Sequence, residues 1–188
     1  HRRDLGLILI NNCNFGFSLL QGNAAELPHG TDLLRLFNDV LDVLNSKRRI
    51  IDGTVTLLNC MVQGKSLNDM IRIGGDIIGN PISLVDYTGK LLAVSNPQAI
   101  SSADLTPEGY LKQETYSTFR TYKFTKKVNE SPVPILVDFD HAEMPRMILG
   151  KIVIRNKIVG HLAAVENERP FTDDDVESVK VLIDVVTS

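Results

Sequence analysis

The stretch of residues 66–95 constrains the fold most, because it predicts a capped helix that leads directly into a two-stranded hairpin. Ser66 and Asp69 have the spacing of a capping box, in which the serine oxygen accepts a backbone N–H and the carboxylate reaches back to the cap. Gly79, followed by Asn and Pro, predicts the end of the helix, since glycine adopts positive φ and proline cannot continue the run. The segments ISLVD and KLLAVS then flank a tight turn that contains Gly89.

Helices are also expected before and after this stretch. Apolar residues recur at helical spacing from Leu33 to Leu44 and from Ile51 to Val62, as one long kinked helix or as a helical pair. Thr172, followed by three aspartates, predicts the cap and first turn of a closing helix, where carboxylates complement the helix dipole. A metal cluster is the alternative reading of the aspartates. Consecutive helical positions point about 100° apart, however, which does not bring them to one ion.

The remaining apolar segments predict one antiparallel sheet. VPILVDF, MILGKIVIR and KIVGHLAAVE indicate three strands, the last two joined through Asn156-Lys157, which makes five strands from Ile82 onward. A helix over Gly109 to Phe119, with Pro107 in its first turn, is expected between them. DLGLILINN and NFGFSLLQ predict a further strand pair about an Asn-rich turn, which adds to the main sheet or pairs across a subunit boundary. The expected fold class is α+β, an antiparallel sheet of five or six strands flanked by helices, with long N-terminal and C-terminal helices.

Composition narrows the class of protein. With 188 residues and 43% hydrophobic content, the chain is long enough to bury a core of one domain or one and a half. A net charge of −3 gives no field for holding a phosphate backbone, which argues against nucleic-acid binding by this part alone. The apolar runs are too short to span a bilayer, so a cytoplasmic location is expected. Cys13 and Cys60 form no Cys-x-x-Cys element and are interpreted as small apolar fillers, and no cofactor is expected.

Three segments resemble a known family: QGKSLNDMIRIGGDIIGNPISLVDYTGKLLAVS, IVGHLAAVENERPFTDDDVESVKVLIDVV and the preceding LLRLFNDVLDVLNS. They are similar to the GAF-type sensor region of bacterial transcription regulators of the PucR/CdaR type, which control purine catabolism and sugar-diacid use. The resemblance covers the chain from about Thr31 onward. It implies a strand pair left from a preceding domain at 1–30, linker and dimerisation helices at 31–64, and a GAF-like sensor domain at 65–188. Because such regulators carry a helix-turn-helix after the sensor, the chain is expected to lack its DNA reader and to reach DNA only through it.

The resemblance implies a domain that binds a small metabolite and relays the binding across a homodimer. Residues 103–127, rich in Tyr and Thr, are interpreted either as a lid over the sheet or as an ordinary surface connection. An organic acid or a purine derivative would need cations and stacking surfaces. The candidate ligand-binding residues are Tyr110, Tyr116, Phe119, Arg120, Lys123, Asp138, His141 and Arg146. The candidate dimer surface consists of Leu33, Phe37, Val40, Leu41 and Leu44.

Two other classes of function stay open. One is a ligand-free dimerisation or scaffold module whose interior is filled by its own side chains. The other is a small enzyme that uses His141 with its neighbouring carboxylates, or a metal held by the same cluster. No Gly-x-Ser-x-Gly elbow occurs, and the GAF-type methionine sulfoxide reductases use cysteines around the pocket, whereas both cysteines here precede the domain core. We therefore expect no enzyme, and we interpret His161, in a predicted strand, as a sheet-face residue.

Overall fold

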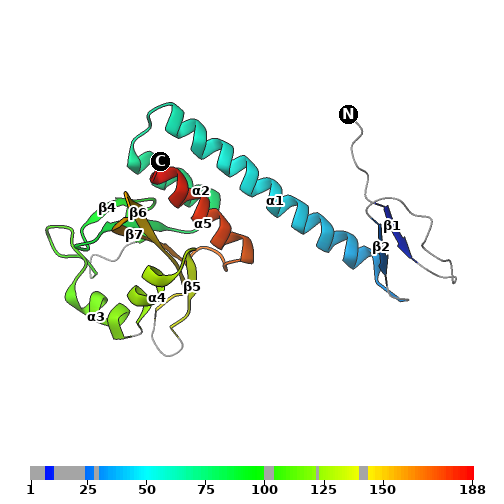
Figure 1. The fold of residues 1–188 in the computed structure, drawn as a ribbon. Helices are drawn as coiled ribbons and strands as arrows, with labels where there is room; N and C mark the ends of the chain where they lie inside the picture. Colours follow the sequence, from blue (N-terminus) through cyan, green and yellow to red (C-terminus); the bar gives the residue numbers. More distant parts are fainter. Residues whose placement is uncertain (1–6, 11–23, 28–29, 100–103, 122, 140–143) are drawn as a thin grey trace. The chain divides into compact units, whose positions relative to one another are not determined.

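The computed structural model describes residues 7–10, 24–27, 30–99, 104–121, 123–139 and 144–188. The chain divides into two compact units, His1–Asn45 and Ser46–Ser188 (Figure 1). The first unit contains β1 (Leu7–Ile10) and β2 (Ala24–Leu27), which form a parallel two-stranded sheet of their own.

The predicted strand DLGLILINN is confirmed by β1, but its expected partner is not the strand that pairs with it in the structure. NFGFSLLQ lies outside the described residues, and β1 instead pairs with β2, further along the chain. A parallel pair needs a connection of about a dozen residues, and residues 11–23 supply one of that length. A tight Asn-rich turn would have made the pair antiparallel.

Helix α1 (Leu33–Val62) resolves the choice between one helix and two, because its 30 residues form a single helix that runs through the boundary of the two units. The Asp32 carboxylate starts it by accepting the backbone N–H groups of Leu34 and Arg35, at 3.0 and 3.1 Å. The helix ends before Gly64, whose φ of 65° lies in the left-handed region.

The second unit is built on the predicted antiparallel sheet. Its strands are β3 (Ile82–Asp86), β4 (Leu91–Val94), β5 (Ile135–Val137), β6 (Met147–Ile154) and β7 (Lys157–Val165), in the order β4-β3-β7-β6-β5. A short 3-10 turn, η2 (Pro97–Ala99), follows β4. The β6–β7 turn is formed by Arg155 and Asn156, with φ of 50° and 62°, one residue earlier than predicted. Two consecutive left-handed residues are typical of the tight turn that matches the twist of a hairpin.

One face of the sheet is covered by α2 (Leu67–Ile78) and α5 (Asp173–Val186) (Figure 1). The capping box predicted for Ser66 with Asp69 and the cap predicted at Thr172 are both confirmed, and α2 ends at Gly79 with a φ of 68°. Thr172 also forms a capping box with Asp175, which was not predicted from the sequence. The main hydrophobic core lies beneath these helices and includes the second half of α1 through Leu57. Its buried members are Leu57, Ile71, Ile78, Ile82, Leu84, Ala93, Ile148, Ile152, Leu162, Ala164, Val179, Leu182, Ile183 and Val185.

The opposite face carries α3 (Gln113–Thr121) and α4 (Phe124–Glu130). The helix predicted over Gly109 to Phe119 is wrong at its start. Residues 106–109 form a turn, and Tyr110 and Leu111 make strand-like bridges back to Lys90 and Leu105. Backbone groups committed to those bridges cannot begin a helix, so α3 starts four residues later than predicted. Helix α4 was not predicted from the sequence.

Among the described residues, no helix has both the length and the apolar composition needed to cross a bilayer.

Candidate functional site

The two faces of the sheet are covered to different extents. On the side of α2 and α5, the central strand residues Ile82, Leu84, Ile148, Leu162 and Ala164 are all buried, each no more than 3% exposed. On the side of α3 and α4, several alternate residues remain only partly buried: Ser83, Val85, Val94, Lys151, His161 and Ala163. Since successive side chains of a strand point to opposite faces, the difference reflects the covering elements, not the strands themselves.

Small and polar side chains gather on this partly covered face. In the antiparallel register, Ser83 lies opposite Ala163, while Val85 and Lys151 lie on either side of His161. Cross-strand partners share a face, so these five residues form two adjacent rows. Ser83 and Ala163 are the small residues of this face.

A polar cluster joins this face to α4. His161 Nε2 lies 2.8 Å from Asn129 Oδ1, and Lys151 Nζ donates to the Asn129 carbonyl at 2.6 Å. Burial lowers the pKa of His161 below its ordinary value of 6.5, which keeps the imidazole neutral at pH 7. With a proton on Nε2, the ring donates to the amide oxygen, and its other nitrogen is an acceptor. Lys151 therefore supplies positive charge and His161 a neutral hydrogen-bonding edge.

Aromatic side chains fill the neighbouring space under β5 and β6. Phe139 makes edge-to-face contacts with Phe119 and Phe124, with ring centroids 6.1 and 4.9 Å apart. Ser83, Val85 and Val94 belong to neither hydrophobic cluster of the described chain. The buried aromatic packing on this face therefore lies beneath β5 and β6.

Those predicted ligand-binding residues that the structure describes do not meet at one point. Tyr110 is 37% exposed and lies beside the hairpin, where Lys90 Nζ is 5.7 Å from its ring centroid. Phe119 belongs to the aromatic cluster. Lys123 and Asp138 are exposed, directly before α4 and after β5. The side chains of Tyr116 and Arg120, and His141 as a whole, lie outside the described residues.

Arg146 is held by a carboxylate of its own chain. Its guanidinium makes a two-pronged ion pair with Glu166, with Nε to Oε2 at 2.8 Å, and Glu166 also accepts the Phe171 N–H at 2.6 Å. The hydrogen bond to Glu166 raises the pKa of Arg146, and the same bond lowers the pKa of Glu166 below 4.5. Arg146 thus fixes the start of β6 to the loop before α5.

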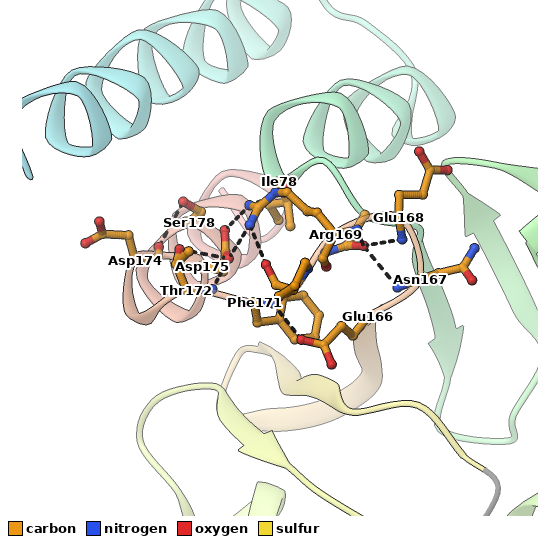
Figure 2. A network of polar contacts seen from close by, with 12 residues as sticks. Ile78, Glu166, Asn167, Glu168, Arg169, Phe171, Thr172, Asp174, Asp175 and Ser178 are labelled. Atoms are coloured by element: carbon orange, nitrogen blue, oxygen red, sulfur yellow. Dashed lines mark hydrogen bonds and ion pairs between the residues drawn. The ribbon is translucent and has the colours of Figure 1, made fainter. Parts of the chain in front are cut away.

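A second polar network continues from that loop to the helices on the other face (Figure 2). Arg169 contacts both carboxylate oxygens of the fully buried Asp175, at 3.0 and 2.5 Å, and donates to the Ile78 carbonyl. Asn80 Oδ1 accepts the N–H groups of residues 167 and 168, at 3.1 and 2.9 Å. The loop between β7 and α5 is therefore tied to the end of α2 and the start of α5.

A shallow depression of about 230 Å³ lies at the β6 edge beside α5. Its lining residues are Ser131, Pro132, Val133, Pro134, Lys151, Val153, Lys180, Ile183, Asp184 and Thr187. Lys151 is the residue that this depression shares with the polar cluster on the sheet face.

The predicted dimer surface is solvent-exposed on α1. The exposed fractions of Leu33, Phe37, Leu41 and Leu44 are 53, 60, 39 and 59%, and Val40 is partly buried. Large apolar side chains thus recur along one helix and are exposed to solvent in the single chain.

The sequence patterns do not point to Asn129 or Lys151, and they predict His161 only as a sheet-face residue. The signal for Lys151 in the sequence is weak: a lysine in an otherwise apolar strand, MILGKIVI, which is unusual for a strand inside a sheet. Asn129 could not be found, because α4 itself was not predicted.

No known family model and no curated protein matches the sequence. Solved structures similar to this chain include the cofactor-binding GAF domain of the nutrient sensor CodY from Clostridium difficile. Its TM-score is 0.47 at 16% identity, covering 78% of this chain and 96% of that one.

Two further similar structures are GAF domains. The phycocyanobilin-bound domain of a cyanobacterial phytochrome has a TM-score of 0.45 at 12% identity, covering 73% of this chain and 91% of that one. The GAF domain of Acinetobacter phosphoenolpyruvate-protein phosphotransferase has a TM-score of 0.42 at 13% identity, covering 73% of this chain and 89% of that one. With TM-scores below 0.5, these likenesses assign no function.

Proposed function

We propose that residues 65–188 form a GAF-like sensor that binds a small metabolite on the α3–α4 side of the sheet. The observation that carries the proposal is the contrast between the two faces. One face is sealed by apolar helices, while the other presents Ser83, Val85 and Ala163 only partly covered, beside the polar pair Lys151 and His161. Ligand sites are typically concave and mostly apolar, with a few fixed polar groups.

The chemistry of the polar groups favours an anionic or hydrogen-bonding ligand, such as an organic acid or a purine derivative. Lys151 supplies the charge, and His161 supplies a neutral acceptor or donor. Tyr110, Tyr116 and Phe119 remain the proposed stacking surfaces, with Arg120, Lys123, Asp138 and His141 as further contacts. Arg146 contributes by positioning, since Glu166 already occupies its guanidinium.

We further propose that the sensor acts within a bacterial transcription regulator of the PucR/CdaR type and works as a homodimer through α1. The sequence resemblance supports the regulator, and the exposed apolar residues of α1 support the dimer. The recipient of the signal is the DNA-binding part that such regulators carry. A fusion of this chain to a DNA-binding domain that needs dimerisation would report whether a metabolite changes repression.

Thermal-shift screening of organic acids and purine derivatives, followed by native mass spectrometry, tests the sensing proposal. A binder should raise the melting temperature of the chain by mass action. Ser83→Leu, which adds volume at a partly buried position of this face, should abolish that rise while the variant still folds. The control is Val153→Leu, which adds volume at the exposed end of strand β6. If the ligand is an acid, Lys151→Met should weaken binding, whereas Lys157→Met, at an exposed position, should not.

A ligand-free scaffold is the second candidate, and the packing of Phe119, Phe124 and Phe139 beneath β5 and β6 favours it. It predicts that no metabolite stabilises the chain and that Ser83→Leu leaves stability unchanged or improved. An enzyme that uses His141 remains the less favoured alternative, tested by loss of any turnover in His141→Ala.

A further inference from the structure

Helix α1 carries a heptad repeat along nearly its whole length. Counting from Leu34, positions three and four residues apart alternate without a break as far as Val62, as in the a and d positions of a coiled coil. The a positions are Leu34, Leu41, Arg48, Val55 and Val62, and the d positions are Phe37, Leu44, Ile51 and Leu58. Eight of these nine residues are apolar, and at 1.5 Å per residue they extend over about 42 Å.

This seam is exposed to solvent in the single chain. The exposed fractions of its apolar members run from 39% at Leu41 to 82% at Val62. In the second half of α1, by contrast, Gly53, Leu57 and Cys60 are buried within the second unit, to which this half belongs. The helix therefore has two apolar surfaces, one already packed within the chain and one that nothing in the described chain covers.

We propose that the seam pairs with the same seam of a second copy of this chain, as a parallel, in-register two-stranded coiled coil. The inference rests on the proposed dimer and deepens it: it names Leu34 to Val62 as the contact and fixes the direction of the two helices. A strict spacing of 3.5 residues matches another helix with the same repeat, because that spacing keeps a and d residues facing the partner along a supercoil.

Charge favours the parallel arrangement. In a parallel pair, a g residue faces the e residue five positions later on the partner helix. Lys47 is a g residue and Asp52 is the e residue five positions later, so two opposite-charge pairs form symmetrically. In an antiparallel pair, g faces g and e faces e, which offers these residues no partner of opposite charge. Lys47 and Asp52 are 58 and 71% exposed. In the single chain Lys47 Nζ contacts Glu177 at 3.5 Å and Asp174 at 3.9 Å, so pairing with the partner's Asp52 exchanges these solvent-exposed contacts for one across the seam.

Arg48 is the single polar residue of the seam. A lone polar a residue costs stability, but it sets the register of a coiled coil, because a shifted register would bury it against apolar side chains. In register, two Arg48 residues share one layer, and each guanidinium is directed to Asp52 of its own helix at 3.6 Å. Asp52 thus serves both Arg48 and the partner's Lys47.

Cysteine cross-linking of the full chain tests the direction. In a Cys13→Ser background, in which the native Cys60 is buried, Leu44→Cys and Ile51→Cys should each form an interchain disulfide under mild oxidation. Asp39→Cys, exposed at an f position on the far side of α1, should not. Cross-linking between Phe37→Cys chains and Leu58→Cys chains, without self-linking at position 44, would indicate antiparallel helices and overturn the proposal.

Two neighbouring residues provide a matched pair of variants for measuring how the seam contributes to dimer affinity. Leu44 (d) and Val43 (c) are both 59% exposed, and only Leu44 lies on the seam. Leu44→Lys should weaken dimerisation by roughly 100-fold or more in sedimentation equilibrium, and Val43→Lys by no more than about twofold. Equal effects of the two variants, or a monomeric parent chain, would refute the coiled coil. Association with an unrelated protein through position 44 would refute it as well.

These outcomes are separate from those of the sensing proposal. All cross-linking and sedimentation experiments are done without a ligand. A parallel dimer whose stability no metabolite changes would therefore support the coiled coil and refute the sensing proposal. Circular dichroism tests whether Leu44→Lys is folded. If it is not, the cysteine cross-linking series still decides whether the helices form a parallel dimer.

Discussion

Asp175 shows at the level of one residue how an apparent metal-binding pattern becomes a structural contact. Of three consecutive aspartates, this one is fully buried, where it caps α5 and pairs with Arg169. We expect Asp175→Ala to destabilise the chain by about 3 kcal/mol, because it leaves a guanidinium without its partner and removes the cap. Asp173→Ala, in the same turn but exposed, should cost less than about 1 kcal/mol. Urea denaturation of both variants measures the difference, and equal losses would contradict this role of Asp175.

Glu166 should make the stability of the folded chain depend on pH. Its pKa is lowered by Arg146, so the charged carboxylate stabilises the folded chain at pH 7, and that stabilisation is lost as the pH falls below 4.5 and through the lowered pKa. The stability difference between the parent chain and Glu166→Gln should therefore be largest near neutrality and shrink in acid. Glu168→Gln, at an exposed neighbouring position, should give a difference that does not depend on pH in this way. Denaturation midpoints measured from pH 7 to about pH 3.5 test the sign, and a difference that grows in acid would reverse it.

At the scale of elements, the contact between α2 and α5 depends on a glycine. A Cβ built at Gly74 would lie 2.5 Å from a methyl carbon of the fully buried Leu182. Alanine favours helices over glycine, yet here the two helices would have to separate, so we expect Gly74→Ala to lose about 1 to 3 kcal/mol. Asn68→Ala, on an exposed position of the same helix, should be neutral or slightly stabilising. A stabilised Gly74→Ala in thermal denaturation would show that the helices do not pack this closely.

The elements predicted correctly are those whose limits are determined by local chemistry. Caps at Ser66 and Thr172, the stop at Gly79 and the five-strand count all follow from side-chain spacing near each boundary. The start of α3 was missed because the bridges of Tyr110 to Lys90 and of Leu111 to Leu105 override local helix propensity. The pairing of β1 with β2 was missed for the same reason: a parallel partner is not marked by any turn.

The candidate site was harder to predict than the fold. Arg146 was chosen for its charge, but whether a cation is free depends on a partner 20 residues away, Glu166. Lys151 and His161 come together only through the register of β6 and β7, and Asn129 joins them from an unpredicted helix. The sequence indicates which kinds of residues a ligand would need, but the pairing register of the sheet determines which of them lie close together.

At the scale of the whole molecule, the stability of the chain should depend on its concentration. If the seam of α1 is covered only in a dimer, unfolding releases two chains, and mass action then raises the melting temperature as the protein is concentrated. Over a 100-fold range we expect a rise of about 3 to 5 °C, because the gain in free energy is divided between two chains. The Leu44→Lys variant should melt at one temperature throughout, while Val43→Lys follows the parent. Scanning calorimetry at matched concentrations measures the slope. A melting temperature of the parent chain that does not change with concentration would mean that the apolar residues of the seam stay exposed to water and that α1 does not pair with a second copy.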